Sequence, residues 1–211
     1  YKRQVLCASL YFGFGWCASI AFFAPSYLMT NDHFKGKYEV ELKYRLSSKS
    51  EFLKTLNLIA HEVMLQDNQE CDWYFDSPDR SLQAQNKSLC IRTMEPSGIK
   101  LWIVKGPESD RCEATNITDA SNAKSMLENL GYEVILKAQK TRSIYFVGEF
   151  HITVDSLAGI GDFAEFAIMT DDESKLSVYK SELELLASKF GLTQSALQTQ
   201  SYKQMFEEMN A

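Results

Sequence analysis

Acidic and basic side chains alternate with apolar ones along residues 37–46. Glu39, Glu41, Lys43 and Arg45 occupy every second position of this segment. Successive side chains of a β-strand point to opposite faces, so these four charged groups are predicted to share one face. Considered alone, the pattern is also typical of an ordinary half-buried strand whose charged face meets solvent.

Later segments repeat the pattern, because further ionisable residues share strand faces with one another or lie opposite apolar residues. A sheet with so many ionisable groups on successive strands is predicted to close into a barrel with a polar lumen. The candidate basic residues of that lumen are Lys43, Arg45, Arg92, Lys105, Arg111, Lys140 and Arg142. The candidate acidic residues are Glu39, Glu41, Glu113, Asp155 and Glu165.

Acids and bases interleaved in one cavity favour a particular chemistry. Basic side chains suit phosphate oxygens, which arginine can bind bidentately. Carboxylates beside phosphates suit Mg²⁺, which binds through a few carboxylates together with substrate oxygens. An anion pocket would not need the acids and a metal cage would not need the bases, so the mixture indicates a metal–polyphosphate site.

The rest of the chain is predicted to supply the elements that position these residues. The fold class is α+β: an antiparallel eight-stranded closed β-barrel, a tunnel with a polar lumen, surrounded by helices. The predicted strands span residues 37–46, 71–76, 88–95, 99–105, 111–116, 132–146, 149–155 and 162–169. The predicted helices span residues 50–65, 118–130, 171–190 and 198–209.

Composition excludes several classes of protein. The chain has 211 residues, and its 28 acidic against 22 basic side chains give a net charge of -6. That charge argues against a nucleic-acid binder that works by bulk charge. The five cysteines contain no CxxC pair, which argues against a zinc ribbon or a disulfide framework.

The first 28 residues differ from the remainder. Lys2 and Arg3 precede an apolar run over residues 5–24, about the length of a membrane helix. We expect residues 1–28 to be an apolar leader, either translation upstream of an initiator Met29 or a membrane or signal segment. Residues 29–211 are then expected to be the catalytic domain.

Six segments in order along the chain resemble the motifs of the CYTH superfamily, the triphosphate tunnel metalloenzymes. Glu39-Val-Glu-Leu-Lys43 fits the family's ExExK signature. The other five segments are Trp73–Asp76, Ile91-Arg92, Trp102–Pro107, Lys140-Thr-Arg142 with Tyr145, and Asp155–Glu165. Together they span about residues 36–205, which makes the resemblance strong although each motif alone is weak.

Within the superfamily the chain resembles the class IV adenylyl cyclases of bacteria. Residues 94–107, 142–148 and 161–172 carry this likeness. Many relatives that hydrolyse triphosphates have a second carboxylate where this chain has Ala167, two residues after Glu165. That departure favours the cyclase branch.

The resemblance implies that ATP is the substrate and that 3′,5′-cyclic AMP and pyrophosphate are the products, with one or two Mg²⁺ or Mn²⁺ ions as cofactor. The implied catalytic residues are Glu39, Glu41, Lys43 and Arg142. The implied phosphate-binding residues are Lys43, Arg45, Arg92, Lys105, Arg111, Lys140 and Arg142. The implied metal ligands, or their close supports, are Glu39, Glu41, Asp155 and Glu165. A cytoplasmic homodimer is also implied, with no nucleic-acid partner and no membrane unless residues 1–28 are a genuine anchor.

Several alternatives stay open at this stage. The same tunnel could serve a triphosphatase acting on inorganic or thiamine triphosphate, or a non-catalytic polyphosphate-binding module. The cyclase could also be membrane-tethered. His151 could act as a general base on the face of Asp155, or it could be a structural histidine near the barrel rim.

Overall fold

A single curled antiparallel sheet dominates the computed structural model, which describes residues 32–210. The sheet order is β5-β4-β3-β2-β6-β7-β8-β1-β9. The strands are β1 (Tyr38–Arg45), β2 (Glu62–Asp76), β3 (Ser88–Glu95), β4 (Lys100–Lys105), β5 (Cys112–Asn116), β6 (Glu133–Val147), β7 (Phe150–Leu157), β8 (Gly161–Thr170) and β9 (Leu197–Gln198).

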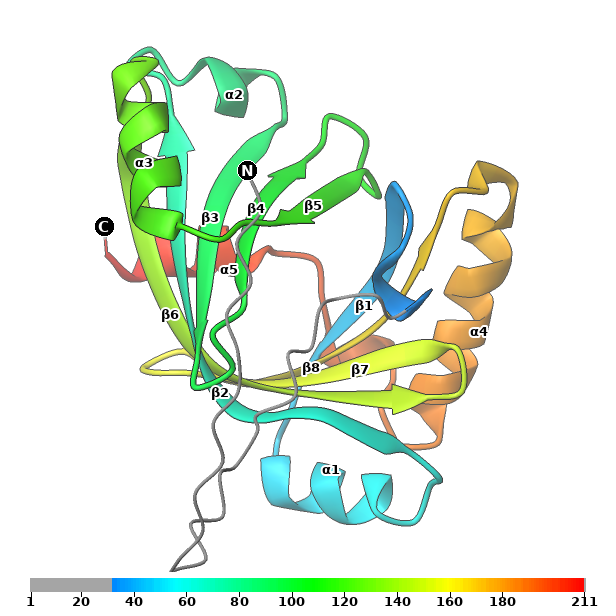
Figure 1. Ribbon diagram of the computed structural model, residues 1–211. Helices are drawn as coiled ribbons and strands as arrows, with labels where there is room; N and C mark the ends of the chain where they lie inside the picture. Colours follow the sequence, from blue (N-terminus) through cyan, green and yellow to red (C-terminus); the bar gives the residue numbers. More distant parts are fainter. Residues whose placement is uncertain (1–31, 211) are drawn as a thin grey trace, which may run out of the picture.

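Helices α1, α3 and α4 lie on the outside of the curl and cover different parts of the sheet (Figure 1). Helix α5 packs instead against β6, β7 and β8 on the face that carries the cavity residues. The α-helices are α1 (Lys49–Leu56), α2 (Ser81–Ala84), α3 (Ala120–Asn129), α4 (Leu176–Ser188) and α5 (Tyr202–Met209). The 3₁₀ helices are η1 (Asp32–Phe34), η2 (Glu173–Lys175) and η3 (Gln194–Ala196). No helix within residues 32–210 is long and apolar enough to span a membrane. The predicted leader, residues 1–28, lies outside the described part of the chain.

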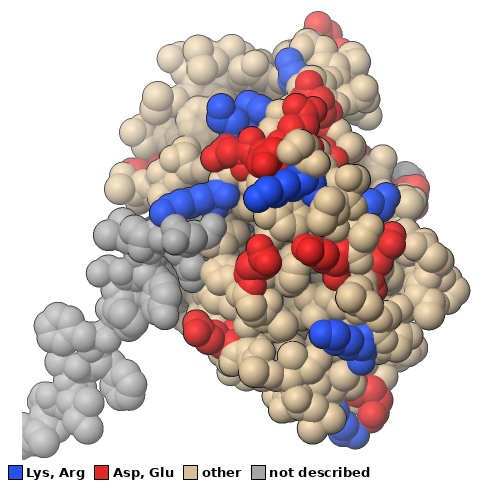
Figure 2. Space-filling view, turned by 90° about the vertical axis from the view of Figure 1, so that its right-hand side faces the viewer, with Lys and Arg blue, Asp and Glu red and all other residues tan. Residues whose placement is uncertain are grey.

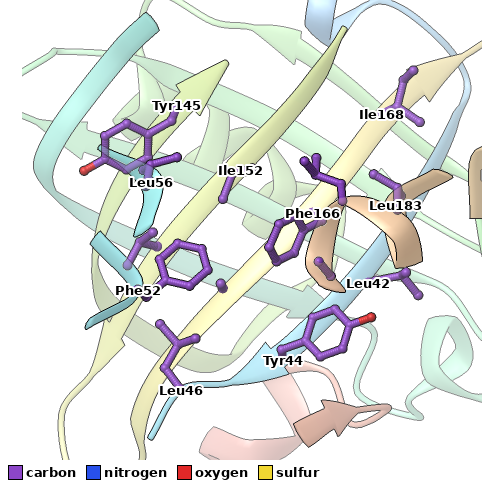
Figure 3. Packing of buried hydrophobic residues seen from close by; sticks show 14 of the residues in the cluster. Leu42, Tyr44, Leu46, Phe52, Leu56, Tyr145, Ile152, Phe166, Ile168 and Leu183 are labelled. Atoms are coloured by element: carbon purple, nitrogen blue, oxygen red, sulfur yellow. The ribbon is translucent and has the colours of Figure 1, made fainter. Parts of the chain in front are cut away.

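The two faces of β1 explain why the helices pack where they do. Its apolar side chains point outward into a core shared with α1 and α4, shown in Figure 3. Phe52 and Leu56 of α1 and Leu183 of α4 are buried in that core. Burying a side chain of this size contributes roughly 1.5–3 kcal/mol. The charged face of β1 is thereby turned to the inside of the curl.

The predicted antiparallel α+β architecture is confirmed, but the closed eight-stranded barrel is not. The sheet has nine strands rather than eight. The extra strand, β9, was not predicted because two residues are too few to show any alternation in sequence. The start of β1 meets the segment before β5 through one bridge, between Tyr38 and Arg111. Backbone bonds Glu39 N–Asp110 O (2.8 Å) and Cys112 N–Lys37 O (2.9 Å) flank that bridge.

The helix predicted over residues 50–65 is wrong in its second half. The helix α1 ends at Leu56, and the chain re-enters the sheet as β2 at Glu62. Register shifts near Leu65 interrupt the pairing of β2 with β6, so the start of this strand lacks a two-residue alternation. Its apolar residues therefore resembled a continuation of the helix. The last predicted helix also begins later than expected, at Tyr202.

The carboxylate of Asp76 holds the turn between β2 and α2. It accepts backbone hydrogen bonds from Ser77 (2.8 Å), Leu82 (2.9 Å) and Gln83 (3.0 Å). Burial opposes ionisation, but these bonds hold the pKa of Asp76 below its ordinary value.

We expect Asp76→Ala to lower the free energy of unfolding in urea by about 2 kcal/mol at neutral pH, because three backbone donors lose a charged acceptor. The exposed Asp79, which accepts only from the Ser77 hydroxyl among the described residues, provides the control: Asp79→Ala should cost less than about 0.5 kcal/mol. A lowered folded-state pKa stabilises the protein at pH values above the unfolded-state pKa. The loss of unfolding free energy caused by a second variant, Asp76→Asn, should therefore shrink as the pH falls below about 4. Equal costs for the two alanine variants would contradict this role.

Candidate active site

The interior of the curl contains a cavity of about 280 Å³ that gathers most of the predicted site residues. The predicted residues that line it are Glu39, Glu41, Lys43, Arg92, Lys105, Lys140, Arg142 and Glu165. They come from five strands, so the curl brings together side chains that are far apart in sequence. By contrast, acidic and basic side chains are interspersed over the outer face shown in Figure 2.

Four other predicted residues do not line this cavity. Arg45 is exposed, donates to the carbonyl oxygen of Ile160 (2.8 Å), and lies over the ring of Phe163. Arg111 pairs instead with the exposed Glu113 (2.5 Å). Arg45 is the last residue of β1, beyond the enclosed part of that strand. Arg111 and Glu113 alternate with Cys112 and Ala114, which line the cavity, so they lie on the opposite face. The fourth residue, Asp155, lies directly behind the cavity wall.

Asp155 is fully buried and holds the guanidinium of Arg142. Nε and Nη2 of Arg142 donate to the two carboxylate oxygens of Asp155, each at 2.6 Å. Nη2 of Arg142 also contacts Glu165 at 2.5 Å. The hydroxyl of Tyr202 donates to Asp155 at 2.8 Å. This geometry favours Asp155 as a support for Arg142 over a role as a direct metal ligand.

Two acidic residues of β2, Glu70 and Asp72, were missed by the sequence analysis. Arg92 donates to both oxygens of Asp72 (2.7 and 2.9 Å), and its Nε lies 3.0 Å from Glu70. Lys140 pairs with Glu70 and lies 3.2 Å from Asp72. Burial alone would raise the pKa of Asp72, but Arg92 and Lys140 hold it well below its ordinary value.

A second ion pair lies near the start of β1. Lys105 Nζ is 2.9 Å from Glu39, and His151 Nε2 is 3.8 Å from the other oxygen of that carboxylate. Burial raises the pKa of Glu39, but Lys105 and His151 outweigh it and lower this pKa well below its ordinary value. His151 is buried and lines the cavity, so it lies among the charged residues of the site.

Glu41 is different, because within residues 32–210 its carboxylate makes no hydrogen bond or ion pair. Burial and the neighbouring carboxylate of Glu165 raise the pKa of Glu41 to about 7. Glu165 itself has a pKa lowered to about 2, because Arg142, Lys43 and Lys140 outweigh the effect of its burial. An unpartnered carboxylate beside a second, ionised one is the arrangement that a bound cation would stabilise.

The acidic residues therefore fit a divalent cation shared with a substrate. In the described part of the chain, no three His, Cys, Asp or Glu residues are already arranged to hold a metal. Mg²⁺ ordinarily binds through one or two carboxylates and substrate phosphates rather than in an all-protein cage. Glu41 and Glu165, with Glu39 nearby, match that requirement.

The cavity also has an apolar wall. Buried side chains of β3, β4 and β6 and of the β3–β4 turn form it, and they belong to one hydrophobic cluster with η1 and the start of β2. The apolar residues of this wall include Phe34, Met64, Leu65, Met94, Ile99, Leu101, Ile103 and Ile144. The cavity therefore offers a charged side and an apolar side to one ligand.

Comparison of the sequence with known proteins identifies relatives of this chain. The model of the CYTH domain matches residues 37–202. The chain is 59% identical over 180 residues to the adenylate cyclase CyaB of Aeromonas hydrophila, covering 85% of this chain and 94% of that protein.

Two solved structures extend the comparison. A protein from Vibrio parahaemolyticus is 56% identical with a TM-score of 0.80, over 84% of this chain and all of that one. The PH1819 protein of Pyrococcus horikoshii is 25% identical with a TM-score of 0.72, over 82% and 99% of the two chains. The resemblance drawn from the six sequence motifs is confirmed: the chain belongs to the CYTH family.

Proposed function

We propose that this protein is an adenylate cyclase of the class IV type, which converts ATP into 3′,5′-cyclic AMP and pyrophosphate. The identity to the Aeromonas cyclase supports this activity. The structural observation that carries the proposal is the pairing of a charged side and an apolar side in one cavity. A triphosphate alone needs only the charged side, whereas the base of a nucleotide needs an apolar surface as well.

The basic residues of the cavity would bind the triphosphate. Lys43, Arg92, Lys105, Lys140 and Arg142 line one continuous space, which suits a chain of three phosphoryl groups. Carboxylates that pair with all five of them hold their charged ends in place before the substrate arrives. Arg45 and Arg111 lie outside this space, so we leave them out of the proposed site.

The reaction would begin with the ribose 3′-oxygen in line with the α-phosphorus. A bond forms between these atoms, the bond from the α-phosphorus to the bridging oxygen breaks, and the proton of the 3′-hydroxyl passes to solvent. Basic residues around the leaving pyrophosphate would stabilise its growing negative charge. Glu39, Glu41 and Glu165 would hold one or two Mg²⁺ or Mn²⁺ ions, which when bound supply further positive charge to the phosphates and lower the pKa of the 3′-hydroxyl.

Ala167 favours cyclisation over triphosphate hydrolysis. It lines the cavity two residues after Glu165, where many relatives that hydrolyse triphosphates carry a second carboxylate. The cavity therefore has one acidic group fewer than that arrangement would provide. The cytoplasmic location, the homodimer and the division of the chain at residue 29 stay predictions.

The activity itself is tested by product analysis. The full chain is incubated with ATP and Mg²⁺ or Mn²⁺, and the products are separated by chromatography. We expect cyclic AMP and pyrophosphate in equal amounts. Release of ADP and orthophosphate without cyclic AMP would identify a triphosphatase instead.

We expect Glu41→Gln to reduce the initial rate of cyclic AMP formation by about 100-fold, because the amide keeps the size of the side chain and removes its charge. Glu113 is the matched control, since it is exposed on β5 and pairs with Arg111 outside the cavity. Glu113→Gln should retain the rate within about twofold. Equal rates for the two variants would exclude Glu41 from the site.

Ile103→Trp tests the apolar wall. The indole would fill the apolar side and should weaken ATP binding in calorimetry by about tenfold, while inorganic tripolyphosphate binds within about twofold of the wild type. Val104, the next residue on β4, is exposed, so Val104→Trp should change neither affinity. Equal losses for ATP and tripolyphosphate in Ile103→Trp would contradict a base-binding role for this wall.

A further inference from the structure

Tyr202 contacts the charged side of the cavity from outside the main strands. It is the first residue of α5, the last helix of the described chain, which packs against Leu136 and Ala138 of β6 on the cavity side of the sheet. Lys43 Nζ lies 4.3 Å from the centre of its ring, and Lys140 Nζ lies 5.6 Å from it. One aromatic side chain therefore touches the ammonium groups of two different strands.

The hydroxyl of Tyr202 reaches a third cation indirectly. It donates to Asp155 (2.8 Å), whose two oxygens hold the guanidinium of Arg142. Asp155 is completely buried, so each hydrogen bond that it accepts stabilises its charge. The phenol thus helps fix the carboxylate that orients Arg142.

The ring is held firmly enough to act as a support. Ser201 and Gln204 form a reciprocal capping box that begins α5 immediately before Tyr202. One turn later, Met205 and Phe206 are buried in a core with Leu136, Ala138, Leu157 and Phe163. The rings of Tyr202 and Phe163 pack edge to face at 5.5 Å.

Lys43 depends most on this contact. The nearest carboxylate that it pairs with in the described chain, Glu165, lies 3.9 Å away, beyond ordinary hydrogen-bond distance. A lysine side chain has four rotatable carbons and loses considerable entropy when it is fixed. An ammonium within about 6 Å of an aromatic ring is attracted to the face of the ring, and more strongly when water is excluded.

We propose that Tyr202 is a positioning residue for the phosphate-binding cations: its ring holds Lys43 and Lys140, and its hydroxyl holds Arg142 through Asp155. The inference rests on the proposed function only in taking this cavity as a triphosphate site. It assigns the C-terminal helix a part in ligand binding that is separate from its part in the core.

The test compares Tyr202→Leu, Tyr202→Phe and Met205→Ala. Met205 is buried in the same helix, but it does not line the cavity, so its alanine variant controls for a loosened α5. Binding of inorganic tripolyphosphate is measured by calorimetry, and stability by urea unfolding. We expect Tyr202→Leu to weaken binding about tenfold, and Tyr202→Phe, which keeps the ring, to stay within about threefold. Met205→Ala should lose stability but not affinity.

A double-mutant cycle sharpens the result. If the ring acts through Lys43, the loss caused by Tyr202→Leu should largely disappear in a Lys43→Met background. Tyr202→Met provides a second non-aromatic variant should the leucine variant not fold. The proposal would be overturned if both non-aromatic variants bound tripolyphosphate with wild-type affinity. It would also be overturned if Met205→Ala lost as much affinity as the Tyr202 variants for the same loss of stability.

Tripolyphosphate binding requires no turnover, so this test is independent of the reaction. A wild-type protein that binds tripolyphosphate but forms no cyclic AMP would overturn the proposed cyclase and leave the role of Tyr202 standing. If the wild-type protein forms cyclic AMP but Tyr202→Leu and Tyr202→Met bind tripolyphosphate with unchanged affinity, the cyclase proposal stands and the role of Tyr202 is overturned.

Discussion

Ionised side chains placed inside a protein must be paired, and that constraint explains most of this structure. An unpaired buried charge costs several kcal/mol, whereas a charge held by a well-aligned partner is tolerated. Two bidentate ion pairs meet the requirement, one between Arg142 and Asp155 and one between Arg92 and Asp72. The pairs contribute little net stability by themselves. In the proposed function, their benefit is that they keep cationic groups in fixed positions for the triphosphate.

The sheet must supply the stability that the charged interior does not. Strand β1 presents charged residues inward and apolar residues outward, the reverse of an ordinary strand packed on a hydrophobic core. The outer face therefore needs its own cover. The helices α1 and α4 provide it over β1, β7 and β8, where Phe166, Ile152 and Leu183 have no exposed surface (Figure 3). Along β1, the outward face contributes to the core and the inward face contributes to the proposed site.

Some features of the site could be predicted because they are local. The alternation of Glu39, Glu41 and Lys43 places all three on one face whatever the rest of the chain does. Glu70 and Asp72 obey the same rule, with Cys71 between them facing away. Glu70 was missed because β2 begins with an irregular, bulged segment that hides its period, so the predicted strand began at residue 71. Asp72 lay within that predicted strand but was not included among the candidate acids. A search for acidic pairs two residues apart next to a known strand would have found them.

Sequence alone determined the residue types, the faces on which they lie and the family motifs, because strand alternation is a property of neighbouring residues. Tertiary structure decided which of these faces enclose a common space. Arg45 shares a strand face with Lys43 yet lies outside the cavity, and Tyr202 enters it from a helix more than 150 residues away from that lysine. The curl of the sheet and the docking of the last helix set those positions, and both arise from contacts between residues that are distant in the chain.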